Sequence, residues 1–186
     1  MEVLQAAATV AVESHEGNVA KFTGDGVLAE FASTERAAFG AMQLLLRFGQ
    51  LTESWPHGPH QIRLGMHLGD VAVGADGDIY GDGVNRASRL EGLAEPGRVL
   101  LSEDVYRQLR SRPVLVLTDL GTRSVKGYDE PLRVYDLEPT KELARSLLRE
   151  AATREATSQT ARAPRYARPT AIGITVGIFT FVALGV

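Results

Sequence analysis

Apolar and polar residues alternate along residues 1–139 with two spacings, which predict helices and strands in turn. Residues 2–14 carry small and apolar side chains at helical spacing. A second helix is predicted to begin at Ser33 or Thr34, because either hydroxyl is typical of a helix N-cap and Glu35 follows in the first turn. Between these helices, short apolar runs at residues 19–23 and 27–31 flank Gly-Asp-Gly, which predicts a tight β-hairpin.

The same alternation continues through the rest of this region. Residues 62–68 alternate as a strand, and residues 83–93 form a helix for which Asp82 is the expected N-cap. Further elements are predicted as strands at 71–73, 98–101, 114–117 and 132–137, and as a helix after Ser102. The order α, ββ, α, ββ, α, β, α, β, β predicts an α+β fold with helices on a mixed sheet, and excludes an all-parallel doubly wound fold.

The C-terminal part of the chain has a different pattern. Residues 140–169 are predicted to be a linker, with helix-forming composition over 142–157 followed by Ser, Thr, Gln, Pro and Arg. Residues 170–186 carry no charge, and as a helix they would span roughly 25 Å, close to a bilayer core of about 30 Å. Three arginines precede them, so the pattern predicts a transmembrane helix that keeps the main domain cytoplasmic. The alternatives are a frayed apolar tail or a core helix.

Composition and charge narrow the classes of function. An apolar share of 44% and a charged share of 23% are ordinary for a globular chain, and the lack of cysteine excludes disulfides, zinc-thiolate sites and a cysteine nucleophile. Residues 1–139 hold 13 Lys and Arg against 20 Asp and Glu, a net of −7, whereas residues 140–186 hold 7 against 3, a net of +4. The acidic body argues against nucleic acid as a partner.

The turn Gly24-Asp25-Gly26 is the first candidate for chemistry. A carboxylate at a hairpin tip points outward, and the glycines let phosphates approach closely. Mg²⁺ prefers one or two carboxylates plus substrate phosphates, so Asp25 is a candidate metal ligand and Gly24 and Gly26 are candidate substrate-binding residues. The alternatives are an ordinary turn aspartate and a dinucleotide loop of the pattern G-x-G-x-x-A, which is disfavoured because Asp25 would repel a pyrophosphate.

The helix predicted over residues 83–93 carries the second candidate. Asn85 and Arg89 are four residues apart, so both project from one face, while the apolar positions face the other side. An amide and a guanidinium side by side suit a polyphosphate, one as a neutral donor and the other as a fixed charge. For this pair alone, a solvated polar face is the alternative.

Taken together, these segments resemble the catalytic domain of the class III nucleotidyl cyclases, the adenylate and guanylate cyclases. The matching stretches are KFTGDGVLAEF at 21–31, GMHLG at 65–69, DIYGDGVNRASRLE at 78–91, AEPG at 94–97, VKG at 125–127 and PLRVY at 131–135. The resemblance covers about residues 1–138. It implies a ferredoxin-like, palm-type and mainly antiparallel sheet, and a site formed between two protomers of a homodimer.

The resemblance also implies a role for individual residues. Asp25 looks like the second of the family's two metal-binding aspartates, which hold two Mg²⁺ or Mn²⁺ ions at each site. Lys21 looks like the lysine that reads the purine, and Asp78 like its acidic partner. Asn85 looks like the residue that orients the ribose and the transition state, and Arg89 like the one that binds the developing phosphate charge.

The paired Lys21 and Asp78 also predict the substrate. Adenine offers a donor at N6 and an acceptor at N1, whereas guanine presents the reverse pattern. Asp78 can only accept and Lys21 can only donate, so the pair favours ATP by about 1–3 kcal/mol per good contact. The implied reaction is attack of the ribose 3′-hydroxyl on the α-phosphate, which gives cyclic AMP and pyrophosphate in intracellular signalling. The expected partner is a second cyclase domain, from this chain or another.

The chain departs from the family pattern at one point. The family's first metal-binding aspartate lies on a strand well before the hairpin, yet none of the 24 residues ahead of Asp25 is an aspartate. That strand would lie in the middle of the sheet, and without it unpaired edges would be exposed. Three hypotheses explain this departure. The favoured one is that the chain is a fragment or has a misplaced start. The alternatives are a non-catalytic regulator and a chain whose metal site is supplied by a complete cyclase partner.

Several other polar residues are predicted to be structural. His67 lies on a strand and is expected to be a core histidine rather than a catalytic base. Arg63, Arg86 and Arg98 are expected to be surface or structural residues. The histidines of WPHGPH at 55–60 are expected in a solvated loop rather than at a metal.

Overall fold

The computed structural model describes residues 2–24, 26–55, 59–74, 78–124, 130–158 and 175–180. Up to residue 139 its elements follow the predicted order, with one additional short strand at residues 79–80. The elements are α1 (Glu2–Ser14), β1 (Gly17–Thr23), β2 (Gly26–Phe31), α2 (Thr34–Leu51), β3 (Arg63–Leu68), β4 (Ala72–Val73), β5 (Ile79–Tyr80), α3 (Asp82–Leu93), β6 (Val99–Ser102), α4 (Glu103–Leu109), β7 (Leu115–Arg123), β8 (Leu132–Pro139), α5 (Lys141–Ser158) and β9 (Thr175–Thr180).

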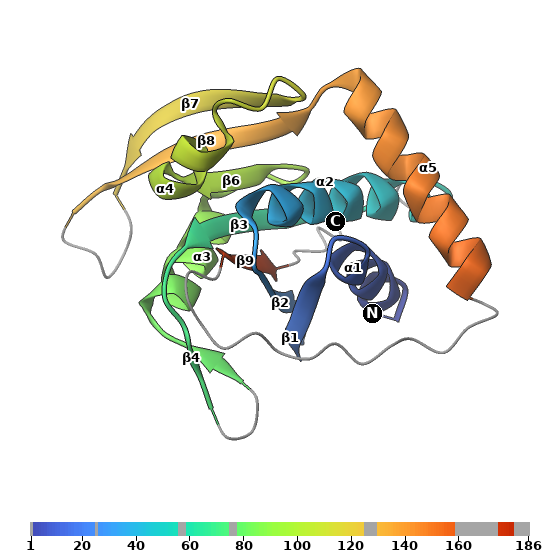
Figure 1. The fold of residues 1–186 in the computed structure, drawn as a ribbon, viewed down its shortest axis with the longest axis horizontal. Coiled ribbons are helices and arrows are strands. Elements are labelled where there is room, and N and C mark those ends of the chain that lie inside the picture. The colour runs from blue at the N-terminus through green and yellow to red at the C-terminus, as the bar shows by residue number, and fades with distance from the viewer. Residues whose placement is uncertain are drawn as a thin grey trace.

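Seven strands form one sheet in the order β1-β2-β9-β3-β6-β8-β7, and β4 pairs with β5 in a separate ladder (Figure 1). Within the described residues, β3 and β6 run parallel and the other neighbours run antiparallel. The α+β fold with a mixed, mainly antiparallel sheet is therefore confirmed. In this fold, a single sheet carries helices on both of its faces.

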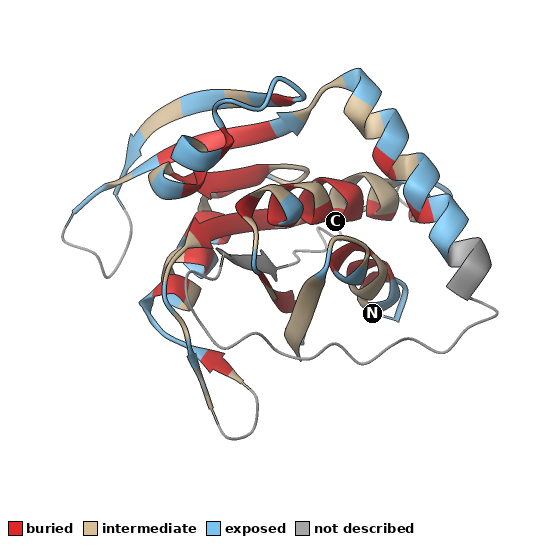
Figure 2. Cartoon of the chain, in the orientation of Figure 1, coloured by how far each residue is buried: buried red, intermediate tan, exposed pale blue. Residues whose placement is uncertain are grey.

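The two faces of the sheet follow from the alternation of side chains along its strands. In β2, Val27, Ala29 and Phe31 join the large core under α1, α2 and α4, whereas Leu28 packs on the opposite side with Ala87 of α3. Figure 2 shows the buried residues concentrated on the sheet and on the helix sides that face it. The hairpin strands are thus held from both sides, which gives the turn between them a rigid base.

The C-terminal apolar segment is a strand where the structure describes it, and the prediction of a transmembrane helix over residues 170–186 is wrong there. β9 lies between β2 and β3 and pairs antiparallel with both, from Phe31↔Thr175 and Leu68↔Thr175 at one end to Gly26↔Thr180 and Arg63↔Thr180 at the other. The expected gap in the middle of the sheet is therefore filled. An uncharged apolar segment suits this place, because a central strand is covered on both faces.

The structure does not support the membrane anchor that was predicted from that helix. Among the described residues, none of the helices combines the length and the apolar character needed to cross a bilayer. The rest of the predicted transmembrane segment, residues 170–174 and 181–186, lies outside the described residues.

The range predicted as a linker begins with a packed helix. α5 spans Lys141–Ser158, and its side chains Leu147 and Ala151 are buried. Leu147 belongs to the same core cluster as residues of α1 and α2, against which α5 packs (Figure 1). Residues 141–158 therefore continue the globular body, because burial of one apolar side of a helix is what stabilises it.

Candidate functional site

Two residues 57 positions apart meet at the edge of the sheet. Lys21 Nζ on β1 donates a hydrogen bond to Asp78 Oδ2, just before β5, at 2.9 Å. The two side chains are 33% and 29% exposed, so the pair is half-buried and open to a ligand. The structure thus brings together the two residues that were predicted to read a purine.

An irregularity in the β1–β2 hairpin turns Lys21 toward Asp78. The pairing register shifts between Val19 and Lys21. Strict alternation would send both side chains to one face, yet Val19 packs on the core under α1 and α2, while Lys21 reaches Asp78 beside Ile79 of the α3-side cluster. Bulges commonly re-aim a side chain in this way.

Tyr80 is a third member of this cluster that sequence reasoning missed. Its hydroxyl donates to Asp78 Oδ2 at 3.2 Å, and Lys21 Nζ lies 5.3 Å from the centre of its ring. The ring is 46% exposed. The sequence signal for it was weak, because no strand was predicted at residues 79–80 and only the short separation from Asp78 pointed to Tyr80.

α3 carries Asn85 and Arg89 on its exposed side, while Gly83, Ala87, Leu90 and Glu91 are buried on the other. The predicted common face of Asn85 and Arg89 is therefore present. The predicted N-cap is wrong, because Gly81 occupies that position without a side-chain bond. Asp82 is instead the first helical residue and forms an ion pair with Arg86 at 2.6 Å.

Close approach of α3 to the sheet depends on Gly65 in β3. A Cβ atom at Gly65 would lie 2.3 Å from the carbonyl oxygen of Ala87 and 2.4 Å from the amide nitrogen of Glu91. Both are backbone atoms of α3, so no side-chain rotation relieves the contact. An ion pair at 3.1 Å between the half-buried Arg63 and the buried Glu91 joins the same two elements.

We expect Gly65→Ala to displace α3 and to lower the free energy of unfolding by about 1–3 kcal/mol, because the added methyl overpacks backbone against backbone. Denaturant unfolding measures this loss. The matched control is Gly92→Ala on the exposed side of α3, where an added Cβ meets no atom within 4 Å. That variant should gain up to about 1 kcal/mol from helix propensity. Equal stability of the two variants would contradict the close contact.

The hairpin turn lies where the sequence predicted it. Thr23 pairs with Gly26, so the paired ends of the two strands are only two residues apart, and Gly24 has a positive φ of 62°. Gly26 is buried at the start of β2. Asp25, the predicted metal ligand, lies outside the described residues. The roles of Gly24 and Gly26 in substrate binding stay predictions.

Few side chains could bind a metal ion in the described part of the chain. No group of three or more His, Asp and Glu side chains suited to a metal is found there. The carboxylate that the resemblance assigns to a metal is Asp25. One carboxylate together with the oxygens of a bound triphosphate fits Mg²⁺, which is commonly held by one or two carboxylates and substrate phosphates.

His67 is a core residue, as predicted. It is 6% exposed, and its Nδ1 lies 3.0 Å from the hydroxyl oxygen of Ser102. Burial lowers the pKa of His67, and the nearby charge of Arg86 lowers it further. Burial therefore favours the neutral imidazole, which joins β3 to β6 through Ser102.

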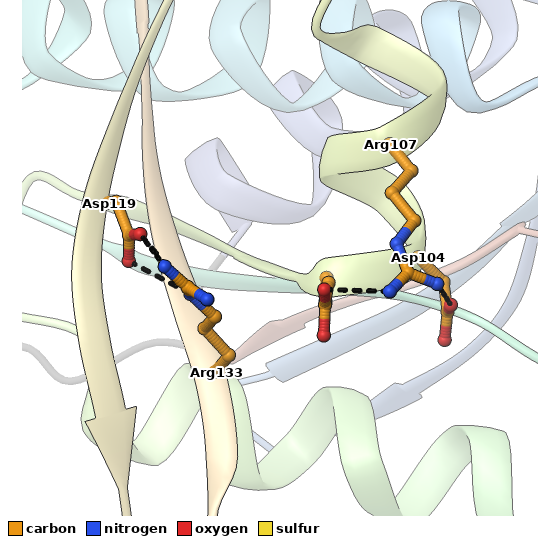
Figure 3. Close-up of polar contacts among 5 residues, drawn as sticks. Asp104, Arg107, Asp119 and Arg133 are labelled. Atoms are coloured by element: carbon orange, nitrogen blue, oxygen red, sulfur yellow. Dashed lines mark hydrogen bonds and ion pairs between the residues drawn. The ribbon is translucent and has the colours of Figure 1, made fainter.

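Other charged groups and cavities lie apart from the predicted site. Figure 3 shows Arg133 bound to Asp119 across β7 and β8, at 2.5 Å, and Arg107 near Asp104 on α4. These exposed pairs contribute little to stability. A cavity of about 560 Å³ lies at the start of α2, between Ser33 and Arg112, and none of the predicted site residues lines it.

The sequence of this chain is similar to those of known proteins. A family model described as the adenylate and guanylate cyclase catalytic domain matches residues 4–139. A Rhizobium meliloti (strain 1021) protein named "Putative adenylate cyclase 3" is 37% identical over 126 residues, which make up 67% of this chain and 21% of that protein. Human guanylate cyclase soluble subunit beta-2 is 32% identical over 99 residues, which cover 50% and 16% of the two chains.

A solved structure supports the same relationship. The adenylate/guanylate cyclase/hydrolase from Silicibacter pomeroyi is 36% identical, with a TM-score of 0.63 over 71% of this chain and 78% of that one. The chain spans only about a fifth of the Rhizobium protein, which is far longer. Because the family model covers well over half of the sequence, the chain belongs to the family of adenylate and guanylate cyclase catalytic domains.

Proposed function

We propose that this domain converts ATP to 3′,5′-cyclic AMP and pyrophosphate, at a site shared between two protomers, as part of intracellular signalling. The observation that carries the proposal is the contact of Lys21 with Asp78 at 2.9 Å. These residues come from distant parts of the chain, and they place a donor and an acceptor next to each other on a half-buried surface. This arrangement supports readout of a base edge.

Adenine fits the pair better than guanine does. The N6 amine would donate to Asp78, and N1 would accept from Lys21. Guanine presents an acceptor where adenine has the amine, and a donor at N1, so both contacts become repulsive or unpaired. Each correct contact favours adenine by about 1–3 kcal/mol.

Asn85 and Arg89 would act on the sugar and phosphate. Both are exposed on α3, so they are available to a nucleotide held between two protomers. The amide of Asn85 would hold the ribose with its 3′-hydroxyl facing the α-phosphate, since a fixed geometry removes much of the entropic barrier. The guanidinium of Arg89 would bind the negative charge that develops on the phosphate.

Asp25 would hold the divalent metal together with the triphosphate oxygens. When bound, Mg²⁺ or Mn²⁺ supplies Lewis-acid stabilisation of the attacking oxygen and of the pyrophosphate leaving group. Two such ions per site are part of the proposal. The glycines on either side of Asp25 leave room for phosphates to approach the tip of the hairpin.

A second candidate function is nucleotide binding and dimerisation without turnover. It is favoured by the sequence TVGIFT of the strand in the centre of the sheet, which contains no acidic residue. The family resemblance places the first metal-binding aspartate on such a central strand. With Asp25 alone, nucleotide binding would persist while catalysis is lost.

We expect the wild-type chain to form cyclic AMP from ATP in the presence of Mn²⁺ or Mg²⁺, and to form much less cyclic GMP from GTP. Chromatographic analysis of the products measures both. Asn85→Ala should lower the rate by about 100-fold, because a preorganised contact to the transition state is lost. Cyclic GMP as the main product would contradict the assignment of ATP. No product from folded protein that still binds ATP would favour the second candidate.

A further inference from the structure

Tyr80 contacts both residues of the proposed base-reading pair at once. Its hydroxyl donates to Asp78 Oδ2 at 3.2 Å, the same oxygen that accepts from Lys21 Nζ at 2.9 Å. Its ring lies 5.3 Å from that ammonium, within the range of a cation–π interaction. One aromatic side chain therefore holds the acceptor by its polar end and the donor by its face.

The contact between Lys21 and Asp78 weakens when Lys21 turns its ammonium toward a base. In the paired state, one N–H of the Lys21 ammonium donates to Asp78, and Asp78 Oδ2 uses one lone pair to accept it. When Lys21 turns toward a base, Asp78 loses a charged donor, and losing a charge-assisted hydrogen bond is costly for a half-buried carboxylate. The hydroxyl of Tyr80 stays on the same oxygen and compensates for part of that loss.

We propose that Tyr80 is a positioning residue for adenine recognition, which keeps Asp78 fixed as an acceptor while Lys21 moves from Asp78 to the base. The proposal rests on the function proposed above, since it assumes that Lys21 and Asp78 read the purine. The ring of Tyr80 limits how far the Lys21 ammonium travels, because the attraction to the ring face is lost at longer distance.

The position of Tyr80 in the chain suits this task. It is the last residue of β5, and only Gly81 separates it from the first residue of α3. The same short segment therefore leads from the base-reading pair to the helix that bears Asn85 and Arg89. Fixing Asp78 through Tyr80 also fixes the start of the segment that presents these two residues.

The test compares binding of 3′-deoxy-ATP and 3′-deoxy-GTP, which lack the attacking hydroxyl and bind without reacting. Dissociation constants are measured by calorimetry with Mg²⁺ in excess. Tyr80→Phe removes the hydroxyl but keeps the ring. We expect it to weaken binding of 3′-deoxy-ATP roughly threefold to tenfold, the value of one ordinary hydrogen bond, and to leave 3′-deoxy-GTP within about twofold. The dissociation constant of 3′-deoxy-GTP divided by that of 3′-deoxy-ATP falls accordingly.

Two controls separate positioning from loss of surface or fold. Phe22→Leu removes an aromatic ring that is 40% exposed and adjacent to Lys21 on β1, and it should leave the ratio unchanged. Tyr80→Leu removes both the hydroxyl and the ring, so its ratio should fall at least as far as that of Tyr80→Phe. Thermal unfolding of each variant shows that the fold is kept.

Each outcome decides the inference. An unchanged ratio in Tyr80→Phe overturns it, and so does a wild-type chain that does not prefer the adenine nucleotide. A reduced ratio in Tyr80→Phe, with Phe22→Leu like wild type, supports it. Because the readout is binding, a chain that discriminates as expected but forms no cyclic AMP overturns the proposed function and leaves the role of Tyr80 standing.

Discussion

Replacing Val176 by proline is expected to unfold the sheet from its centre. β9 pairs with β2 on one side and β3 on the other over residues 175–180. Proline removes a backbone donor, and it is tolerated in edge strands but not in central ones. We expect the free energy of unfolding to fall by about 1–3 kcal/mol, because a backbone group in the centre of the sheet loses its hydrogen-bond partner. Deleting residues 170–186 should have a larger effect, because β2 and β3 would then both present unpaired edges.

Denaturant unfolding and hydrogen exchange measure this effect. The amides of residues 27–31 and 64–68 should lose protection together, since both flanking strands depend on β9. Val176→Ala is the matched control, because it keeps the backbone N–H. If both the proline variant and the deletion unfold like the wild type, β9 is not part of the stable sheet. If the deletion leaves an aggregated protein, the exposed edges are the expected cause.

Mixing two inactive variants is expected to restore activity. Asp25→Ala lacks the proposed metal ligand and Arg89→Ala lacks the proposed phosphate-binding cation, so each alone should lose about 100-fold or more in rate. If each site takes Asp25 from one protomer and Arg89 from the other, a heterodimer of the variants has one intact site. An equal mixture should then reach about a quarter of wild-type activity, because about half of the dimers are mixed.

The experiment measures cyclic AMP after the variants are unfolded together and refolded, so that protomers exchange. Arg86→Ala is the matched control on α3, since Arg86 pairs with Asp82 and has no predicted role in the site. It should stay within a few-fold of the wild type. Loss of activity in both single variants without recovery in the mixture would place Asp25 and Arg89 in a site made by one chain.

Much of the fold was predictable, because it rests on local signals. Helical periodicity gave α1 close to its observed bounds, the capping signal gave the start of α2, and the Gly-Asp-Gly turn gave the hairpin between β1 and β2. The side of α3 that carries Asn85 and Arg89 was also predictable, because residues four apart on a helix share a face. An error occurred at Asp82, where two local interactions compete: the helix begins one residue earlier than expected, and Asp82 pairs with Arg86 one turn later instead of capping α3.

By itself, the sequence determined the types of the elements up to residue 139 apart from β5, the hairpin between β1 and β2, and the family to which the motifs belong. These depend on neighbours in the chain. Tertiary structure alone decided that residues 175–180 form the central strand, because an uncharged apolar segment suits a membrane helix and a buried strand equally, and only the open edges of β2 and β3 select the strand. It also decided the contact of Lys21 with Asp78 and Tyr80, since a register shift in β1 and a partner 57 residues away set the direction of that side chain.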